Sequence, residues 1–186
     1  MNNIKGFIGE FKVKLAMMLL LWFRWKVYHN VTIQLSSGGT SQIDHIAVSS
    51  AGIFVIETKN YKGLIRVNEN TNDWQQIFHH ASYNFYSPIK QNKGHISALR
   101  FMLKTKKPPF YNLVCFVGDA RFAGEPPKEV SIGAFALIAA IKSIHRKHKR
   151  NLTVGEVDQL SRAISDRRMP NTRKTRRIHL KNMKSK

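Results

Sequence analysis

An aspartate, a glutamate and a lysine mark two neighbouring predicted strands, and their types and spacing suit metal-assisted hydrolysis. Asp44 opens the first strand, and Glu57 and Lys59 close the second, two positions apart. Alternate residues of a strand point to the same face, so the Glu57 and Lys59 side chains project together. The apolar run Ile53–Ile56 before them is typical of a strand buried on both faces. Charged groups at the end of such a strand are costly to bury unless they bind something.

The chemistry that these residues suit is hydrolysis of a phosphodiester by an activated water. Mg²⁺ activates water and neutralises phosphate oxygens when one or two carboxylates hold it and leave other positions free. We expect Asp44 and Glu57 to hold Mg²⁺, with Mn²⁺ as a substitute, and the backbone carbonyl of Thr58 to add a neutral ligand. Lys59 would orient or deprotonate the attacking water, or stabilise charge in the transition state. Its residue type leaves these roles open.

Hydrophobic periodicity and turn residues predict the elements that position these side chains. Predicted strands cover residues 26–35, 63–68 and 112–117, besides the two within 42–59. Predicted helices cover residues 2–22, 88–104 and 131–150, and a last one follows the capping pair Thr153 and Glu156. We expect residues 74–86 to form a loop that can include one short strand, and residues 121–128 to form another loop. This order predicts an α/β core around a mixed sheet.

Composition concerns the partners of the protein more than its fold. The 186 residues are enough for one domain with a sizeable core. Lys and Arg number 31 against 11 Asp and Glu, a formal charge of +20, which favours DNA, RNA or an anionic membrane surface as partner. The single cysteine, Cys115, excludes internal disulfides and a cysteine-rich zinc site. It suits a reducing compartment, so we expect a cytoplasmic protein.

The apolar run Leu15–Phe23 is the one segment that raises the question of a membrane. It is nine residues long, whereas a membrane-spanning helix needs about twenty. We therefore expect a helix buried in the core and no integral membrane segment.

Four blocks of the sequence, in the same order, resemble the nuclease-related domain family, abbreviated NERD. The blocks are Gly6–Glu10 (GFIGE), Gln42–Gly63 (QIDHIAVSSAGIFVIETKNYKG), Trp74 and Ser87–His95 (SPIKQNKGH). The spacing of Asp44 from Glu57-Thr58-Lys59 also resembles the D…(D/E)xK signature of the restriction-endonuclease-like superfamily, PD-(D/E)xK. The resemblance covers roughly residues 3–120. It implies a restriction-endonuclease-like α/β core, with a central mixed sheet of four to five strands flanked by helices, followed by a helical basic C-terminal extension.

The resemblance also implies roles for four charged residues. Glu10 corresponds to the acid on the first helix that completes the active-site cluster, as an outer ligand of the metal or of a water. Asp44 and Glu57 correspond to the metal-binding pair. Lys59 corresponds to the catalytic lysine.

Further positions around the expected site are less uniform in the family. Gln91 corresponds to a polar residue on the helix after the sheet, which in related nucleases points into the same site. Some relatives have a tyrosine four residues later, where this chain has His95, so no role is carried over to His95. His45 is expected to face the opposite side of its strand from Asp44, as a structural residue or one that supports the metal ligands from behind.

Three segments with different roles are expected. Residues 1–125 form the NERD nuclease-like core, residues 126–170 a helical extension packed on that core, and residues 171–186 a basic flexible tail. Two basic clusters would hold a nucleic-acid backbone without reading its sequence. They comprise Lys142, Arg146, Lys147, Lys149 and Arg150, and then Arg173, Lys174, Arg176 and Arg177.

The sequence thus predicts a divalent-metal-dependent nuclease, with DNA favoured over RNA as substrate. Whether ends or internal bonds are cut stays open, as does the oligomeric state. The alternative is a non-catalytic nucleic-acid-binding module on an inactive nuclease scaffold, because the charge alone explains binding. A third hypothesis is a protein that binds a membrane surface through Leu15–Phe23 and the basic tail.

Overall fold

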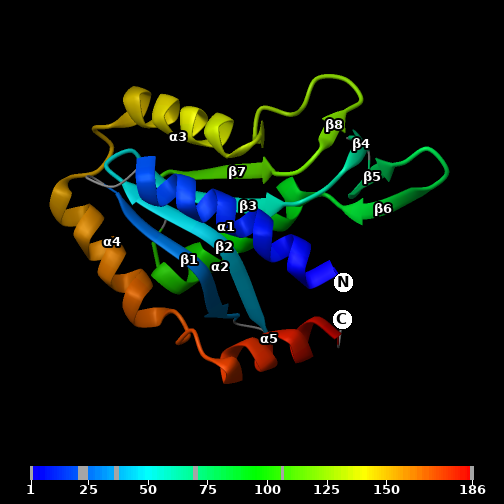
Figure 1. Ribbon diagram of the computed structural model, residues 1–186. Helices are drawn as coiled ribbons and strands as arrows, with labels where there is room; N and C mark the ends of the chain where they lie inside the picture. The colour runs from blue at the N-terminus through cyan, green and yellow to red at the C-terminus, as the bar shows by residue number, and fades with distance from the viewer. Residues whose placement is uncertain (1, 21–24, 36–37, 69–70, 106, 185–186) are drawn as a thin grey trace.

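A five-stranded mixed sheet lies at the centre of the computed structural model, which describes residues 2–20, 25–35, 38–68, 71–105 and 107–184 (Figure 1). Its strands, in spatial order, are β1 (Lys26–Gln34), β2 (Thr40–Ser49), β3 (Gly52–Lys59), β7 (Phe110–Phe116) and β9 (Val130–Ile132). β1, β2 and β3 are antiparallel neighbours, whereas β7 runs parallel to β3 and β9 parallel to β7. The predicted α/β class, with a central mixed sheet of four to five strands, is confirmed.

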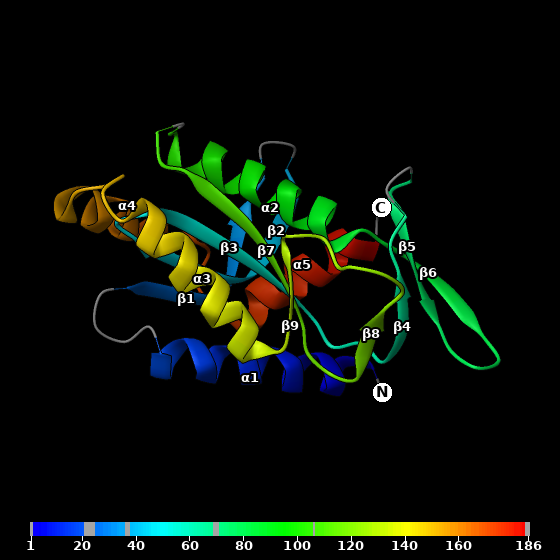
Figure 2. The same cartoon turned by 90° about the horizontal axis from the view of Figure 1, so that it is seen from above.

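Helices lie on both faces of this sheet, so its central strands are buried on both sides (Figure 2). One face carries α1 (Asn2–Leu20) and α3 (Ala134–His148), and the other carries α2 (Pro88–Leu103) and α4 (Val154–Arg167). In β3, Phe54 belongs to the core under α1 and α3, and Val55 belongs to the core under α2 and α4. The alternation follows from the pleat of the strand. It explains why a continuous apolar run precedes Glu57.

A second sheet of four strands extends beyond the end of the central one (Figure 2). In spatial order its strands are β6 (Ser82–Tyr86), β5 (Asp73–Ile77), β4 (Gly63–Arg66) and β8 (Ala120–Phe122). The prediction of a loop over residues 74–86 is therefore wrong. Trp74 and Phe85 pack into the core between the sheets, but the residues around them are polar and exposed. The alternation that identifies a half-buried strand is consequently too short to be visible in the sequence.

The first helix is less buried than its sequence suggests. Met17 of α1 is fully buried, but Leu15 is 46% and Leu19 is 68% exposed. α1 lies on the surface of the sheet, so only one side of the helix enters the core. Trp22 and Phe23 lie outside the described residues. No helix in the described part of the chain is both long and apolar enough to cross a membrane.

The C-terminal segment contains a helix, α5 (Arg173–Lys184), where the sequence predicts a flexible tail. Thr175 is 5% exposed, and Thr40 Oγ1 of β2 lies 3.0 Å from His179 Nδ1. α5 therefore contacts the first residues of β2 (Figure 1). This segment is rich in Lys and Arg, which predicts an exposed tail. The few residues that contact the sheet, such as Thr175 and His179, form no pattern that the sequence alone would show. The boundaries at residues 125 and 170 stay predictions.

Asn92, fully buried in α2, connects this helix to the two central strands. Its Nδ2 donates to the Val55 carbonyl at 2.7 Å, and lies 2.7 Å from Asn112 Oδ1 and 3.1 Å from the Leu113 carbonyl. Ser87 caps the start of the helix through a bond from the Lys90 N–H to Ser87 Oγ, at 3.4 Å. The orientation of α2 is thereby fixed relative to β3, on which the candidate active site depends.

Replacing Asn92 with alanine should destabilise the fold, because the carbonyls of β3 and β7 would lose a buried donor. We expect the free energy of unfolding in urea to fall by about 1–3 kcal/mol. Ser97→Ala, which removes an exposed hydroxyl from the same helix, is the matched control and should leave the unfolding midpoint near that of the wild type. Equal midpoints for Asn92→Ala and the wild type would contradict the assigned role of Asn92.

Candidate active site

Two carboxylates lie side by side, one midway along β2 and the other near the end of β3. The register that pairs His45 with Ile56 sets Asp44 opposite Glu57. Asp44 Oδ2 accepts a hydrogen bond of 2.8 Å from the Thr58 N–H. On the other side of β2, Asn30 stands opposite Asp44 in the β1–β2 register and has a φ of 51°. A non-glycine residue with this φ is strained, and such residues occur most often near functional sites.

Glu57 is 3% exposed and is surrounded by polar groups from β3 and α2. Its Oε1 accepts a hydrogen bond of 2.8 Å from Gln91 Nε2. The same oxygen forms an ion pair with Lys59 Nζ, also at 2.8 Å. Lys59 Nζ also donates to Gln91 Oε1 at 3.0 Å, which closes a triangle of carboxylate, ammonium and amide. Glu57 Oε2 differs. His95 Nε2 approaches it to 3.3 Å, but this oxygen accepts no hydrogen bond from the described residues.

The surroundings of the two carboxylates shift their pKa values in opposite directions. Burial and the neighbouring Glu57 carboxylate raise the pKa of Asp44 well above its ordinary value, although the Thr58 N–H lowers it. Burial also raises the pKa of Glu57, but His95 and the Lys59 ammonium outweigh burial, so the net pKa is lowered. Burial lowers the pKa of Lys59, and the Glu57 carboxylate more than compensates, so that pKa is raised. A negative charge on Glu57 is thus stabilised by the site, whereas for Asp44 the burial and the Glu57 charge outweigh the attraction of Lys59.

The donor set of this cluster fits a magnesium-sized cation. Mg²⁺ binds through one or two carboxylates and keeps positions for water and phosphate. The described residues contain no group of three His, Cys, Asp or Glu side chains placed to hold a metal ion, so the fit rests on the two carboxylates. The charge of Asp44 is only partly offset by Lys59, and Glu57 Oε2 is buried without a hydrogen bond from the described residues, so both have capacity for a cation. Glu10, half-buried on α1, is close enough for its charge to raise the pKa of Asp44.

His95 contacts the cluster although sequence reasoning assigned it no role. It lies one helical turn after Gln91, so both side chains reach Glu57 from the same face of α2. Ser41 Oγ lies 2.7 Å from His95 Nδ1 and fixes the ring from the opposite side. His179 of α5 lies close enough to His95 to be affected by its charge: burial and His95 together lower the pKa of His179. The spacing of four residues between Gln91 and His95 was the available sequence signal.

His45 lies on the face of β2 opposite to Asp44, as the strand alternation predicts. It is 1% exposed, and its Nδ1 is 2.8 Å from His29 Nδ1 of β1. Burial, with a smaller effect of Lys14 on α1, lowers the pKa of His29 to about 4. Burial and His29 lower the pKa of His45 to about 3. This pair is therefore neutral near pH 7 and packs beneath α1, away from the carboxylates.

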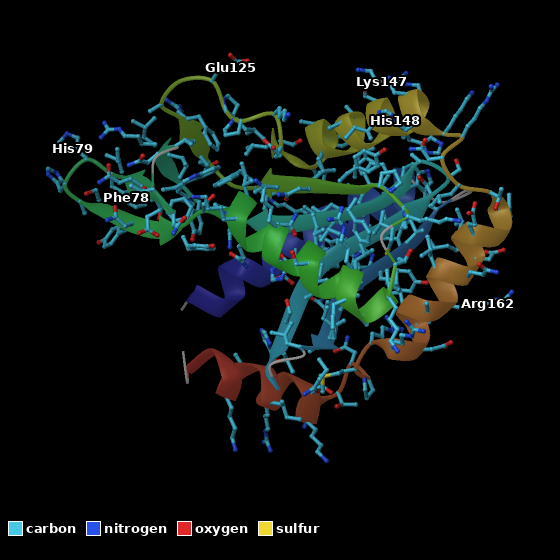
Figure 3. All side chains as sticks on the ribbon, turned by 180° about the vertical axis from the view of Figure 1, so that it is seen from behind. Phe78, His79, Glu125, Lys147, His148 and Arg162 are labelled. Carbon is cyan, nitrogen blue, oxygen red and sulfur yellow. The ribbon has the colours of Figure 1, made fainter. Side chains whose placement is uncertain are left out.

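The two basic clusters predicted from the sequence lie at different distances from the carboxylates. The residues of the first cluster are exposed at the end of α3 and just after it. This end of α3 contacts the β2–β3 turn, where Ser49 Oγ lies 3.1 Å from His145 Nδ1. It is therefore at the opposite end of β3 from Glu57, about 17 Å away at the usual rise of a strand, since Ser49 pairs with Gly52, five residues before Glu57. Figure 3 shows Lys147 and His148 far from the β5–β6 hairpin.

The second cluster lies on α5, whose His179 contacts the first residue of β2, Thr40. Arg173, Lys174 and Arg177 are exposed there, and the side chain of Arg176 lies outside the described residues. Since Thr40 is four residues before Asp44, the second cluster is the one near the carboxylates.

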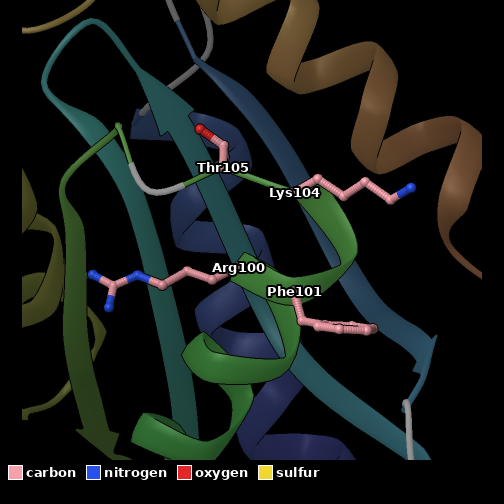
Figure 4. A pocket seen from close by; sticks show the side chains of 4 residues that line it. All are labelled: Arg100, Phe101, Lys104 and Thr105. Carbon is pink, nitrogen blue, oxygen red and sulfur yellow. The ribbon is translucent and has the colours of Figure 1, made fainter.

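A separate pocket of about 520 Å³ lies at the far end of α2 (Figure 4). Arg100, Phe101, Lys104 and Thr105 line it. Arg100 packs over the Phe110 ring, with its guanidinium carbon 4.7 Å from the ring centre. None of these lining residues carries a carboxylate, so the pocket does not extend the candidate active site.

Comparison with known proteins found a family profile, a homologue and a solved structure that are similar to this chain. The sequence profile of the family described as nuclease-related domain, NERD, matches residues 5–117, which include both carboxylates, Lys59 and Gln91. The chain is 30% identical over 169 residues to the uncharacterized protein pXO1-01 of Bacillus anthracis, covering 90% of this chain and 70% of that protein. A crystal structure of a protein of unknown function, AF1548, covers 95% of this chain and 97% of its own at 15% identity, with a TM-score of 0.35.

The opposite pKa shifts of the two carboxylates predict opposite effects on stability without metal. The Asp44 carboxyl ionises near 3.8 in the unfolded chain and at a higher pH in the folded protein, so its ionisation opposes folding above 3.8. In EDTA at about pH 8, Asp44→Asn should raise the melting temperature, by about 2–4 °C for each kcal/mol relieved. This gain should shrink as the pH is lowered to about 5.

Glu57→Gln should change the melting temperature in the opposite direction from Asp44→Asn. The pKa of Glu57 is lowered in the folded protein, so its charge stabilises the fold above the ordinary value of 4.5. This variant should therefore melt below the wild type in EDTA at about pH 8. If both variants shift the melting temperature in the same direction, the proposed charge arrangement is wrong.

Proposed function

Because the chain belongs to the nuclease-related domain family of the restriction-endonuclease-like superfamily, we propose that it hydrolyses phosphodiester bonds in nucleic acid, DNA being favoured over RNA. The five-stranded mixed sheet with helices on both faces is compatible with the core of that superfamily. The observation that carries the proposal is the convergence of Asp44 and Glu57 beside a buried lysine and amide.

A divalent metal, Mg²⁺ or Mn²⁺ in its place, is part of this proposal. Asp44 and Glu57 would hold it, with the Thr58 carbonyl as a neutral ligand and Glu10 acting through a water. When bound, the metal supplies a Lewis acid that activates water and neutralises phosphate charge. The buried Oε2 of Glu57, which accepts no hydrogen bond from the described residues, supports this assignment.

The other side chains of the site bind and orient. Lys59 contributes a fixed positive charge for the phosphate oxygens, since the Glu57 carboxylate and Gln91 hold its ammonium in position. Gln91 hydrogen-bonds to both Lys59 and Glu57, so it helps to hold the Lys59 ammonium against the Glu57 carboxylate. His95 borders the Oε2 side of Glu57 and is held by Ser41, which makes it a positioning residue for that carboxylate.

The basic clusters bind the backbone of the substrate at two distances from the reaction. The α5 cluster, beside Thr40, contacts phosphates near the cleaved bond, whereas the α3 cluster contacts phosphates about 17 Å away. Such contacts depend on charge and therefore position the substrate without reading its sequence.

A non-catalytic nucleic-acid-binding module is the second candidate, favoured by the charge of +20 alone. It differs from the nuclease in one respect that can be measured: binding would not depend on metal or on Asp44, and no strand would be cut.

The nuclease proposal predicts metal-dependent cleavage that requires the clustered residues. With Mg²⁺ or Mn²⁺, purified protein should cut labelled DNA, and Asp44→Asn, Glu57→Gln and Lys59→Met should each lower the rate by about a hundredfold or more. Glu125→Gln, which neutralises an exposed acid in the loop before β9, is the matched control and should cut like the wild type. Circular dichroism checks the fold of each variant. Unchanged cleavage by Asp44→Asn and Glu57→Gln would refute the proposal.

The two clusters can be separated by the length of the DNA. A hairpin duplex of about four base pairs and a duplex of about thirty base pairs, each base pair rising about 3.4 Å, are bound in EDTA and measured by fluorescence anisotropy. Neutralising the α5 cluster should weaken binding of both lengths, whereas neutralising the α3 cluster should weaken only the longer duplex. The two triple variants are Arg173→Gln, Lys174→Gln, Arg177→Gln on α5 and Lys142→Gln, Arg146→Gln, Lys147→Gln on α3. An equal loss on the short duplex for both would contradict the assigned positions.

A further inference from the structure

The hairpin formed by β5 and β6 presents two aromatic rings in contact with each other at its outer end. Phe78 is 41% and Tyr83 is 59% exposed, and their ring centres are 6.2 Å apart with planes at 70°. Both side chains lie on one face of the hairpin, because Tyr83 pairs with Gln76, two residues before Phe78. Figure 3 shows Phe78 and His79 at this outer end, beyond the helices.

The same face of the hairpin is anchored at its inner end. Trp74 and Phe85 face each other across the two strands, and the Trp74 ring stacks on Phe116 at 6.1 Å. The turn at the tip is closed by a 2.7 Å hydrogen bond from the Phe78 N–H to the Ala81 carbonyl. The exposed rings therefore belong to a fixed extension of the core.

Glycine at position 63 allows the Phe78 ring to lie against β4. A Cβ there would come within 3.1 Å of ring carbons of Phe78 and within 2.7 Å of the Ile77 carbonyl oxygen. The φ of Gly63, +83°, also disfavours other residues. One side of the Phe78 ring is thus supported by the sheet, and the remainder is open to solvent.

The composition of the hairpin suits bases better than phosphates. Asp73–Tyr86 contains one acid and no Lys or Arg, and its exposed residues carry amide, hydroxyl, imidazole and aromatic groups. Cations lie beside it on neighbouring elements instead: Lys90 contacts Asn72 and Arg66 pairs with Gln75 near its inner end, and Lys62 lies next to Gly63 near its outer end. Aromatic rings stack on nucleic-acid bases whatever their identity, and nearby cations attract the backbone. This division of rings and charges matches a strand that runs along the hairpin.

The hairpin leads directly into the candidate active site. β6 ends at Tyr86, Ser87 caps α2, and Gln91 follows one turn later. Tyr83 is four residues from Ser87, a distance of about 13 Å along a strand. A strand whose bases contact the rings can therefore place a phosphate several nucleotides away beside Gln91.

We propose that Phe78 and Tyr83 stack on unpaired bases, so that the substrate enters the site as a single-stranded or locally unpaired nucleic acid. The proposal rests on the proposed function for the class of substrate, and it adds which form of nucleic acid is bound. Bases within a duplex are already stacked and paired, so they offer these rings no free face.

The test measures binding in EDTA, where no cleavage occurs. Fluorescence anisotropy compares three probes of equal length: an oligothymidylate, the corresponding abasic oligomer with the same number of phosphates, and a duplex. Phe78→Ala/Tyr83→Ala should bind the oligothymidylate about tenfold or more weakly, since each stacked base contributes about 1–3 kcal/mol. Its affinity for the abasic oligomer and for the duplex should stay within about twofold of the wild type.

Three further variants isolate the rings from other effects. Phe78→Leu/Tyr83→Leu keeps apolar bulk for folding and should lose the same affinity, whereas Phe78→Tyr/Tyr83→Phe keeps both rings and should retain it. Phe101→Ala/Phe135→Ala removes two rings that are 64% and 80% exposed elsewhere, and should bind like the wild type. Full affinity of the leucine variant for oligothymidylate, or an equal loss on the abasic oligomer, would overturn the proposal. Because no metal is present, either result leaves the nuclease proposal to its own cleavage test.

Discussion

The buried carboxylate of Glu57 is the constraint on which the rest of this site depends. An isolated carboxylate at 3% exposure would be strongly unfavourable, and here an ammonium, an amide and an imidazole from two elements surround it. The ammonium and the amide contact Oε1, whereas the imidazole lies 3.3 Å from Oε2, which accepts no hydrogen bond from the described residues. Asp44 stands beside it, and the attraction of Lys59 is too weak to offset the burial of Asp44 and the repulsion from Glu57. The pair therefore has one carboxylate that is held ionised and one whose ionisation a bound cation would favour, which is the arrangement expected of a metal site.

The site is precise because α2 cannot slide along β3. Asn92 binds the backbone of both central strands from inside the core, and Gln91 lies next to it on the helix. The hydrogen bonds of Asn92 therefore hold the helix in the position from which Gln91 and His95 contact Glu57. The surrounding surface is organised at the same end of the sheet: α5 contacts the start of β2, and the β5–β6 hairpin precedes α2. The carboxylates, α5 and the hairpin thus lie around one end of β3, with the α3 cluster at the other.

Local sequence patterns predict much of this arrangement, but they do not predict the β5–β6 hairpin or α5. The central strands were identified because Ile53–Ile56 is continuous and apolar, and α4 because Thr153 and Glu156 form a capping box that the structure contains. The hairpin was missed because its rings point partly to solvent, so burial leaves no regular alternation. α5 was missed because its contacts with the sheet involve single residues within a strongly basic segment. In both cases the stabilising contacts are with distant residues, and these contacts leave little trace in the local sequence.

By itself the sequence determined the α/β class, the spacing of Asp44, Glu57 and Lys59, and the excess of positive charge. These depend on residue type and on short-range periodicity, which any window of the chain carries. It takes the tertiary structure to show that His95 and Ser41 join the cluster, that α5 contacts the start of β2 while the end of α3 contacts the β2–β3 turn, and that two exposed rings of a hairpin contact each other. Such convergence depends on strand register and on how α2 is fixed across the sheet. Register and crossing are set by the sum of many contacts between residues far apart in the chain, so no single segment specifies them.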